Sequence, residues 1–385
     1  MVQSSPCLIS IIHNLMGGEG HIIPYHQALG QALAAIGWQH QVWLPAEPKN
    51  LTLPAHWQLR LPPFDLEAEG GWVSKIARLP LVWQLGKKLG EQLQTWLTAN
   101  TSSCPIIFLE RFIHLQLLAL AIAIAQIPRS QRSRLRVWLL YRRDVHQDAT
   151  RPLYRWLHQG LFQLLGPQNC RFMTDSEPLA QSLAAYFGVA FQVLPIPHTD
   201  FPSAPALGEL SVPIYCWWPG SPRAEKGWST IQALAATPLL APLNCCLVTA
   251  GCAQISPHPQ GVATLALGDR LSRREYTHWL LQSQIILLPY DALAYRERTS
   301  GIFTEAIIAG RLPLVRAQTW MAQELMRYQL ETLILDWEEP QRVWEHIRAI
   351  IHNPQVATQL AIMQKDYQNF HCLSNFATIF SSQLF

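Results

Sequence analysis

Residues 214–236, IYCWWPGSPRAEKGWSTIQALAA, contain a strand, a glycine turn and a helix in one continuous stretch. The apolar run at 214–217 is short and is followed by Pro and Gly, which is typical of a strand that ends in a loop. Apolar residues then recur at helical spacing over 227–236. Strand, loop and helix in this order form the unit of a parallel α/β sheet, so we expect a doubly wound domain here.

The same order continues through the rest of the second half. Each expected element lies a short loop from the next, as α/β units require. The predicted strands are 246–249, 285–288 and 312–315, and the predicted helices are 273–282 and 304–309.

The first half of the chain begins in the same way. A β-branched run at 8–12 leads into a glycine loop at 17–20, and a helix follows that ends at Gly37. Further strands are predicted at 41–44, 106–109 and 137–140. The predicted fold is therefore α/β, with two Rossmann-like, doubly wound domains that face a cleft.

Five prolines between residues 195 and 213 mark the boundary between the two domains, because proline resists both helix and central strand. We expect a first domain at 1–200 and a second at 201–365. A last helical stretch begins at 354, and its end, 366–385, is expected to return to the first domain.

Length and composition exclude several classes of protein. A chain of 385 residues favours two domains. Hydrophobic residues make up 49% and charged residues only 14%, which excludes a disordered chain. The net charge of +3 is too small to indicate nucleic-acid binding. The cysteines contain no CxxC pair, so neither a zinc site nor a disulfide framework is indicated.

The N-terminus lacks a basic leader before its apolar residues, so it does not resemble a signal peptide, and we expect a cytoplasmic protein. The apolar stretch 115–127 is too short to cross a bilayer and predicts a buried helix. Apolar residues between 72 and 96 recur near helical spacing with Lys and Arg between them. This stretch suggests peripheral contact with the inner face of a membrane, although core packing is the favoured alternative.

Two loops of the first domain are candidate ligand loops. Gly17 and Gly18 lie before the first helix, where glycines allow the backbone to approach a bound group and helix amides favour anions. A plain tight turn explains them equally well. The segment 141–148, YRRDVHQD, follows a strand and includes His146, but a surface ion-pair cluster is an equal alternative.

Two loops of the second domain carry a more specific pattern. In Gly220–Gly227, Arg223 and Lys226 follow a glycine turn at the end of a strand, which suits a diphosphate because Arg can bind two oxygens while Lys supplies a compact charge. The alternative is an exposed loop in which a cation pairs with Glu225.

In the other loop, Glu297 and Glu305 bracket a Ser300-Gly301 turn that opens a helix. The helix amides favour a phosphate, and Glu305 can accept hydrogen bonds from ribose hydroxyls. The alternative is that Glu305 only compensates the helix dipole.

Together these motifs resemble the family 4 retaining glycosyltransferases of the GT-B fold. The resemblance covers most of the chain in the right order and rests on four features: the glycine loop near the start, the turn GSPRAEKG, the stretch LSRREY ahead of ILLPY, and Glu-x7-Glu followed by AIIAGRLPLV. It is specific in the second domain. Members of the family usually have Gly-Phe-Gly directly after the first Glu, whereas Arg298-Thr299-Ser300-Gly301 occurs here.

The resemblance implies a role for each candidate residue and makes 1–200 the acceptor-side domain and 201–365 the nucleotide-sugar domain. In the second domain, it implies that Arg223 and Lys226 bind the donor diphosphate and that Ser300 and Gly301 offer it amides. It also implies that Glu305 holds the ribose, that Glu297 contacts the donor sugar, and that the loops within 251–269 surround the base. In the first domain, it implies that Gly17 and Gly18 lie beneath the sugar and diphosphate and that His146 is the histidine of the cleft.

The partners that follow are a nucleotide sugar and a glycan, lipid or other hydroxyl acceptor, with no separate cofactor. Because no Asp-x-Asp occurs, we expect no metal at the diphosphate, and the two cations take that task. The inferred reaction proceeds with retention. Cations and helix amides stabilise the departing diphosphate, the acceptor hydroxyl attacks from the same face, and a leaving phosphate oxygen takes its proton.

Other functions of the same fold are a nucleotide-sugar epimerase and a glycan phosphorylase, and a different class is a non-catalytic, transferase-like partner subunit. A phosphorylase normally needs a cofactor lysine site and a longer chain. The intact Arg223, Lys226 and Glu305 argue against a partner subunit, since a degenerate site should lose such residues first.

Overall fold

The structure is a computed structural model that describes residues 5–13, 21–45, 53–54, 56–67, 76–199 and 213–384. It divides into two compact units. Unit 1 comprises Met1–His198 together with Leu373–Phe385, and unit 2 comprises Thr199–Cys372.

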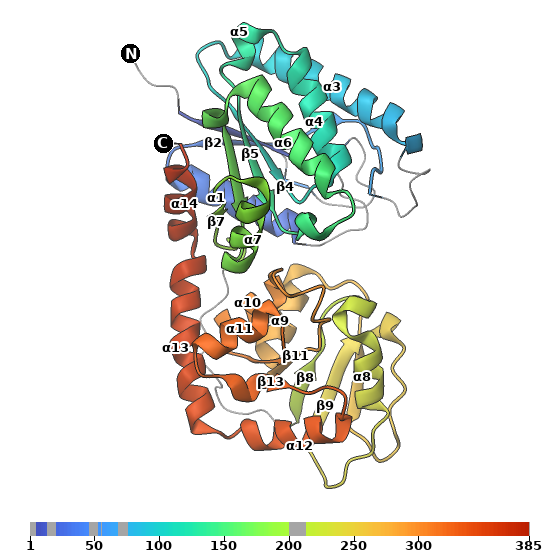
Figure 1. The fold of residues 1–385 in the computed structure, drawn as a ribbon. Helices are drawn as coiled ribbons and strands as arrows, with labels where there is room; N and C mark the ends of the chain where they lie inside the picture. The colour runs from blue at the N-terminus through green and yellow to red at the C-terminus, as the bar shows by residue number, and fades with distance from the viewer. Residues whose placement is uncertain are drawn as a thin grey trace. The chain divides into compact units, whose positions relative to one another are not determined.

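Unit 1 is built on a parallel sheet whose strands, over the described residues, follow the order β3-β2-β1-β4-β5-β6-β7 (Figure 1). The chain runs from β1 through β2 to β3 on one side and from β4 onward on the other, so the order reverses between β1 and β4. The strands are β1 (Cys7–Ile11), β2 (Gln39–Pro45), β3 (Trp57–Leu61), β4 (Ile106–Glu110), β5 (Arg136–Tyr141), β6 (Cys170–Thr174) and β7 (Gln192–Val193).

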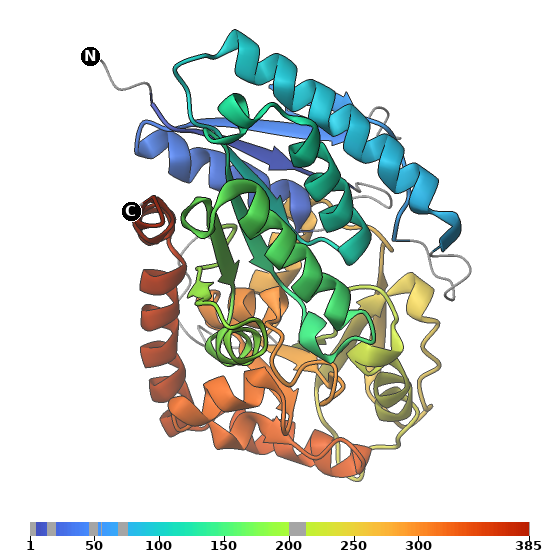
Figure 2. The same cartoon turned by 45° about the horizontal axis from the view of Figure 1, so that its top comes forward.

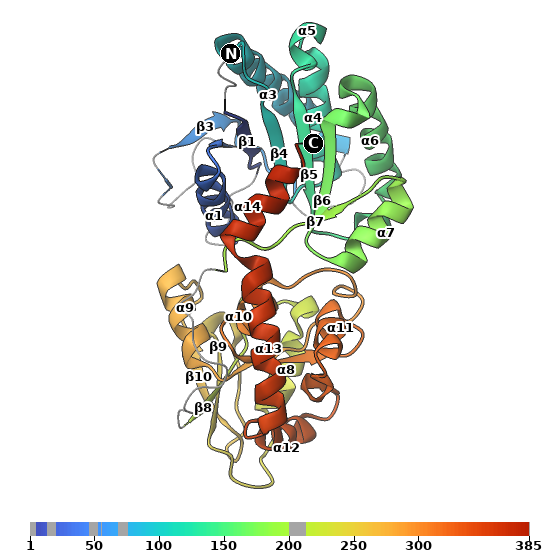
Figure 3. The ribbon, with the colours of Figure 1, turned by 90° about the vertical axis from the view of Figure 1, so that its left-hand side faces the viewer.

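Helices cover both faces of this sheet because successive strand residues point to opposite sides. Ile107 and Leu109 pack with the layer of α3, α4, α6 and α7, in which α3, α4 and α6 lie side by side (Figure 2). Ile106 and Phe108 pack with α1 and α14, which are adjacent (Figure 3). The helices and turns are α1 (Ile22–Ala35), α3 (Leu79–Ala99), α4 (His114–Gln126), α5 (Arg129–Arg132), η1 (Val145–Gln147), α6 (Arg151–Leu165), η2 (Pro167–Asn169), α7 (Glu177–Phe187) and α14 (Leu373–Ser382).

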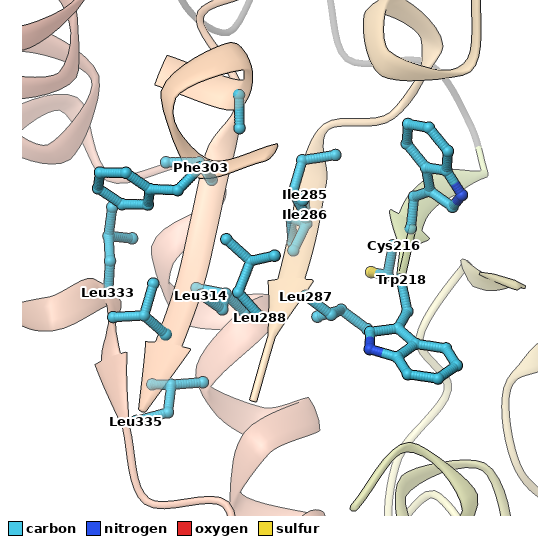
Figure 4. Packing of buried hydrophobic residues seen from close by; sticks show 14 of the residues in the cluster. Cys216, Trp218, Ile285, Ile286, Leu287, Leu288, Phe303, Leu314, Leu333 and Leu335 are labelled. Atoms are coloured by element: carbon cyan, nitrogen blue, oxygen red, sulfur yellow. The ribbon is translucent and has the colours of Figure 1, made fainter. Parts of the chain in front are cut away.

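Unit 2 has a second parallel sheet, in the order β10-β9-β8-β11-β12-β13 over the described residues. Its strands are β8 (Ile214–Trp217), β9 (Cys245–Ala250), β10 (Ala263–Leu267), β11 (Ile285–Leu288), β12 (Leu312–Arg316) and β13 (Ile334–Leu335). The helices and turns are η3 (Ala224–Lys226), α8 (Trp228–Ala235), η4 (Gly251–Ala253), α9 (Arg273–Gln282), α10 (Gly301–Ile308), α11 (Trp320–Arg327), η5 (Glu331–Leu333), α12 (Pro340–Ile350) and α13 (Pro354–His371). Figure 4 shows part of the core, including Ile286, Leu314 and Phe303.

The predicted α/β fold is confirmed in both halves, and each predicted strand has its counterpart in the sheets. The predicted helix at 304–309 was placed too late. It starts at Gly301, because the Ser300 hydroxyl accepts a hydrogen bond from the backbone amide of Phe303 at 3.2 Å and caps the helix there.

The last helical stretch is interrupted at Cys372, whose backbone is extended. The helix before it, α13, belongs to unit 2, and the helix after it, α14, belongs to unit 1. In unit 1 the ring of Phe380 lies 4.8 Å from that of Trp138. The end of the chain therefore completes the core of the unit in which the chain begins.

The apolar stripe considered for a membrane surface lies largely in the interior of unit 1. Five of its positions in α3 are buried, Val82, Leu85, Leu89, Leu93 and Trp96, whereas Leu79, at the start of the helix, is 45% exposed. Core packing is therefore confirmed for the buried positions, while residues 72–75 of the same stripe lie outside the described residues. The predicted buried helix at 115–127 corresponds to α4. Across the described residues, no helix combines the length and the apolar character needed to cross a membrane.

Candidate functional site

The predicted phosphate loops of unit 2 both follow central strands of its sheet. The chain leads from β8 to β9 and β10 on one side and from β11 to β12 and β13 on the other, so the order reverses between β8 and β11. Ligands of open α/β sheets bind beyond the carboxyl ends of the strands at such a reversal. The loops after β8 and β11 are therefore the expected binding loops.

The loop after β8 is a compact turn that depends on glycine. Gly220 has φ +99°, and a Cβ built on it would lie 3.0 Å from the Lys226 ammonium. The indole Nε1 of Trp218 donates a hydrogen bond to the carbonyl of Lys226 at 3.1 Å. Glycine at 220 thus permits both the left-handed backbone and the close approach of the lysine side chain.

The loops after β8 and β11 are joined by backbone contacts. The amide of Asp291 donates to the carbonyl of Glu225 at 3.0 Å. The Lys226 Nζ lies 5.8 Å from the ring centre of Tyr290, and the Ser300 side chain interacts with the Tyr290 hydroxyl. The structure therefore brings both Lys226 and Ser300 to one buried tyrosine.

Positive charge accumulates around Lys226. Burial, followed by repulsion from Arg223 and Arg298, lowers the pKa of Lys226 to about 8, although Glu225 acts in the opposite direction. Arg223 contacts Glu225, with Nη1 3.2 Å from Oε1, so the alternative of a pair within the loop is present. That pair is exposed and weak, so Glu225 offsets only part of the positive charge around Lys226. An anion bound here would relieve this excess.

The start of α10 adds backbone donors to this region. Ser300 is its buried N-cap residue and Gly301 its first residue. Among the described residues, an ideal Cβ on Gly301 would meet no atom within 4 Å, so they leave space next to its backbone. Helix N-termini favour anionic oxygens because their amides lack partners within the helix. Glu297 is partly buried in the loop ahead of this helix.

Glu305 is held by two side chains of α9. Its Oε1 lies 2.9 Å from Nη1 of Arg273, and its Oε2 accepts a hydrogen bond from the Tyr276 hydroxyl at 2.5 Å. Burial and the adjacent carboxylate raise the pKa of Tyr276 well above its ordinary value, so this hydroxyl stays a donor. The buried carboxylate of Glu305 is thus held in one position, and Arg273, which is 40% exposed, extends from it toward solvent.

The loops expected around the base are also connected. The amide of Cys252, in η4, donates to Oδ1 of Asp269 at 2.6 Å, which links the loops after β9 and β10. Across the described residues, no group of His, Cys, Asp and Glu is arranged to hold a metal ion.

The remaining candidates belong to the first domain. Gly17 and Gly18 lie outside the described residues. His146 lies in η1 of unit 1 and is partly buried. In the same segment, Arg143 and Asp148 form the exposed ion pair that was considered as an alternative, at 3.2 Å.

Sequence reasoning missed three side chains of unit 2. Arg298 lies within Glu-x7-Glu, where it appeared only as a departure from the family pattern, and Arg273 and Tyr276 lie within the quoted LSRREY. Nothing in their local spacing connected them with Lys226 or Glu305.

Comparisons with known proteins give similarity in structure only. The sequence matches no protein-family model, and no curated protein is similar to it. Sucrose-phosphate synthase from Thermosynechococcus elongatus superimposes with TM-score 0.64 at 16% identity, over 98% of both chains. HepE of Anabaena, in complex with UDP-glucose, gives 0.62 at 12% identity, again over 98% of both. A Listeria monocytogenes protein assigned as a UDP-N-acetylglucosamine 2-epimerase gives 0.59 at 12%, over 97% of this chain and 94% of that one. The chain has the GT-B fold, with two Rossmann-like domains.

Proposed function

We propose that this protein is a glycosyltransferase that moves a sugar from a nucleotide-diphosphate donor to an acceptor hydroxyl. The observation that carries the proposal is the concentration of Arg223, Lys226 and Arg298 beside the start of α10, with the pKa of Lys226 lowered to about 8. Such an arrangement suits a bound diphosphate. The similar fold of HepE, which was crystallised with UDP-glucose, is consistent with this ligand class.

In the proposed mechanism, Arg223 and Lys226 stabilise the negative charge that grows on the diphosphate as the glycosidic bond breaks. The amides at Ser300 and Gly301 contribute to the same task. Glu305 accepts hydrogen bonds from the ribose, and the loops within 251–269 surround the base.

The donor sugar is contacted by Glu297 in unit 2. Gly17, Gly18 and His146 are the contributions of the first domain.

We further propose that transfer proceeds with retention and without a divalent metal. The sequence has no Asp-x-Asp, and basic side chains are present where a metal would otherwise balance the diphosphate. The acceptor hydroxyl then loses its proton to a leaving phosphate oxygen. Activity that disappears with a strong chelator and returns with magnesium, or an inverted product by NMR, would contradict this.

The test starts from a thermal-shift panel of nucleotide sugars, since a ligand that binds only the folded state raises the melting temperature. Arg223→Ala and Lys226→Met are then compared with the parent. Each should reduce turnover by about 10²–10³, more than it reduces donor affinity, because the charge is greatest in the transition state. The double substitution should cost less than the sum. If each single variant stays within about threefold of the parent, the diphosphate site is not at this loop.

An epimerase is the second candidate, because one protein of similar fold carries that assignment. The two reactions differ in their need for an acceptor. Incubation with UDP-N-acetylglucosamine alone, followed by NMR of the sugar, distinguishes them. A 2-epimer that forms without an acceptor would favour the epimerase, whereas product formation only with an acceptor hydroxyl supports the transferase.

We also propose that the protein is cytoplasmic and contacts a membrane reversibly through α3. Beside the buried stripe, Ile76 and Trp83 are 62% and 59% exposed, and Lys87 and Lys88 are exposed one turn further along. Apolar and basic side chains together suit an anionic lipid surface. Failure to co-sediment with anionic vesicles at low salt would exclude this contact.

A further inference from the structure

Unit 1 has a polar cluster of its own at the carboxyl edge of its sheet. Glu110 is the last residue of β4, Arg142 directly follows β5, and Asp175 directly follows β6. His21 and His26 come from the N-cap and first turns of α1. This edge includes the point between β1 and β4 where the strand order reverses, which is the expected ligand position in this unit.

Glu110 is the centre of the cluster. Its Oε1 lies 3.3 Å from Nε2 of His21 and 3.2 Å from Nε of Arg142, and its Oε2 lies 3.7 Å from Nε2 of His26. Arg142 also contacts Asp175, with Nε 3.6 Å from Oδ2. The Glu110 side chain is only 1% exposed.

The charge of Glu110 determines where the protons of its neighbours lie. Burial acts to raise the pKa of Glu110, but Arg142, His21 and His26 together hold it well below the ordinary value. Glu110 is therefore a carboxylate, which can only accept hydrogen bonds. Because Nε2 of His21 faces this carboxylate at 3.3 Å, a ring with a single proton would hold it on Nε2 and leave Nδ1 as the acceptor.

His21 differs from its neighbours in accessibility. His26 makes the corresponding contact with Glu110 but is 1% exposed, whereas the side chain of His21 is 38% exposed. The ring of His26 is thus almost closed to solvent. The ring of His21 instead presents a polarised acceptor to its surroundings.

Buried polar groups beside this cluster also lack partners. The hydroxyl of Tyr25 is fully buried and interacts electrostatically with Arg142, Glu110 and Asp175, but among the described residues it has no hydrogen-bond partner. His13, just after β1, is 8% exposed, and neither of its ring nitrogens has a partner within the described part of the chain. Native interiors rarely leave such groups unpaired, so they point to a polar ligand.

We propose that Glu110 and His21 form a hydroxyl-binding pair, in which Glu110 orients the imidazole and His21 Nδ1 accepts a hydrogen bond from a sugar hydroxyl. No proton is transferred. The hydroxyl belongs either to the sugar of the donor or to a sugar acceptor. This inference rests on the proposed function, because it takes the ligand to be a sugar, and it places a sugar contact in unit 1.

The test follows the imidazole nitrogens of the full-length, ¹⁵N-labelled protein by NMR. The signals of His21 are assigned by their absence in His21→Phe, and His352→Gln, at an exposed histidine of unit 2, serves as the control. The hydroxyl-binding pair requires a proton on Nε2 of His21 and none on Nδ1 in the free protein. A proton on Nδ1 instead would overturn the inference.

Ligands are then added in two arms. A shift of Nδ1 with UDP-glucose but not with UDP assigns the hydroxyl to the donor. A shift only when D-glucose is added to the UDP complex assigns it to an acceptor. No shift in either arm, while the amide signals of Ser300 and Gly301 respond to UDP, overturns the hydroxyl-binding pair alone. If those amides also fail to respond to UDP, both the hydroxyl-binding pair and the nucleotide-sugar proposal are overturned.

Two substitutions separate binding from a merely structural role. His21→Phe keeps a ring but removes both nitrogens, and it should weaken binding of the responding sugar by on the order of tenfold while leaving UDP binding unchanged. His21→Gln offers an amide N–H to Glu110 and a carbonyl to the ligand, so it should restore a large part of that loss. Equal affinity for the sugar in the parent and both variants would overturn the assignment.

Discussion

A Cβ placed on Gly227 would lie 2.3 Å from the carbonyl oxygen of Pro289, so the two backbones are in direct contact. Gly227 ends the loop after β8, and Pro289 begins the loop after β11. Its φ of +76° also belongs to the left-handed region that glycine favours. This contact is one of those that keep the two proposed phosphate loops together.

Gly227→Ala should therefore lower the free energy of unfolding by about 2 kcal/mol or more, through backbone strain and the clash with Pro289. The control is Gly160→Ala in the interior of α6, where a Cβ meets nothing within 4 Å. That change should raise stability by about 0.5–1 kcal/mol, because alanine favours the helix. Urea unfolding of both variants provides the measurement, and equal effects would show that the contact is not tight.

Gly301→Ala should separate stability from binding. No atom of the described residues lies within 4 Å of a Cβ at this position, and its φ does not require glycine, so the free energy of unfolding should change by less than about 0.5 kcal/mol. If the diphosphate approaches this backbone, the added methyl group should weaken binding of the nucleotide sugar by about tenfold, or roughly 1.4 kcal/mol. Calorimetric titration checks this, and unchanged affinity would move the diphosphate away from α10.

At alkaline pH, the protein should take up a proton when it binds the donor. A diphosphate favours the charged form of Lys226, so binding raises its pKa from about 8 toward or above the ordinary 10.5. Titrations at about pH 8.5 in buffers of different ionisation enthalpy should detect the uptake. The proton uptake should vanish near pH 6, because Lys226 is already charged there. It should also vanish in the Lys226→Met variant. Uptake that persists in Lys226→Met would assign the proton to another group.

The same lowered pKa has a consequence for the free protein. The unfolded chain, with its ordinary lysine pKa of 10.5, binds more protons above pH 8 than the folded chain does at this residue. The contribution of Lys226 to the free energy of unfolding therefore increases as the pH rises from about 8 to 10.5, and Lys226→Met should remove this increase.

Phe380→Ala should destabilise unit 1. Phe380 is fully buried, with ring centres 4.8 Å from Trp138 and 5.6 Å from Phe108. Loss of this side chain should cost about 3–5 kcal/mol, because a cavity remains in the core. Phe370→Ala, at a ring that is 38% exposed near the end of α13, is the control and should cost less than about 1.5 kcal/mol. Thermal unfolding monitored by tryptophan fluorescence compares the two.

Most of the fold could be predicted from the sequence because its signals are local. The apolar run at 285–288 coincides with β11, and the recurrence of apolar residues over 227–236 lies on α8. Periodicity could not locate the start of α10, because the consecutive residues 303–308 are all buried and no separate apolar stripe marks one face of the helix. There the side-chain hydrogen bond of Ser300 determines the boundary.

The site was less predictable, because its contacts depend on strand order. Lys226 and Arg298 come together because β8 and β11 are neighbours, and no local pattern reveals which strands pair. For the same reason, the sequence did not reveal the contact between Arg273 and Glu305. In unit 1, Glu110 directly follows the predicted strand 106–109 and was not a candidate, and only the sheet brings it to Arg142 and His21.

The return of α14 to unit 1 also determines the order in which the protein can fold during synthesis. When the ribosome has made residues 1–198, the apolar side chains that Phe376 and Phe380 later cover, Trp138 and Phe108 among them, are still uncovered. They stay so while the whole of unit 2 is translated, because Leu373–Phe385 follows that unit in the chain. Unit 2 can fold as one continuous segment, whereas unit 1 is started first and completed last.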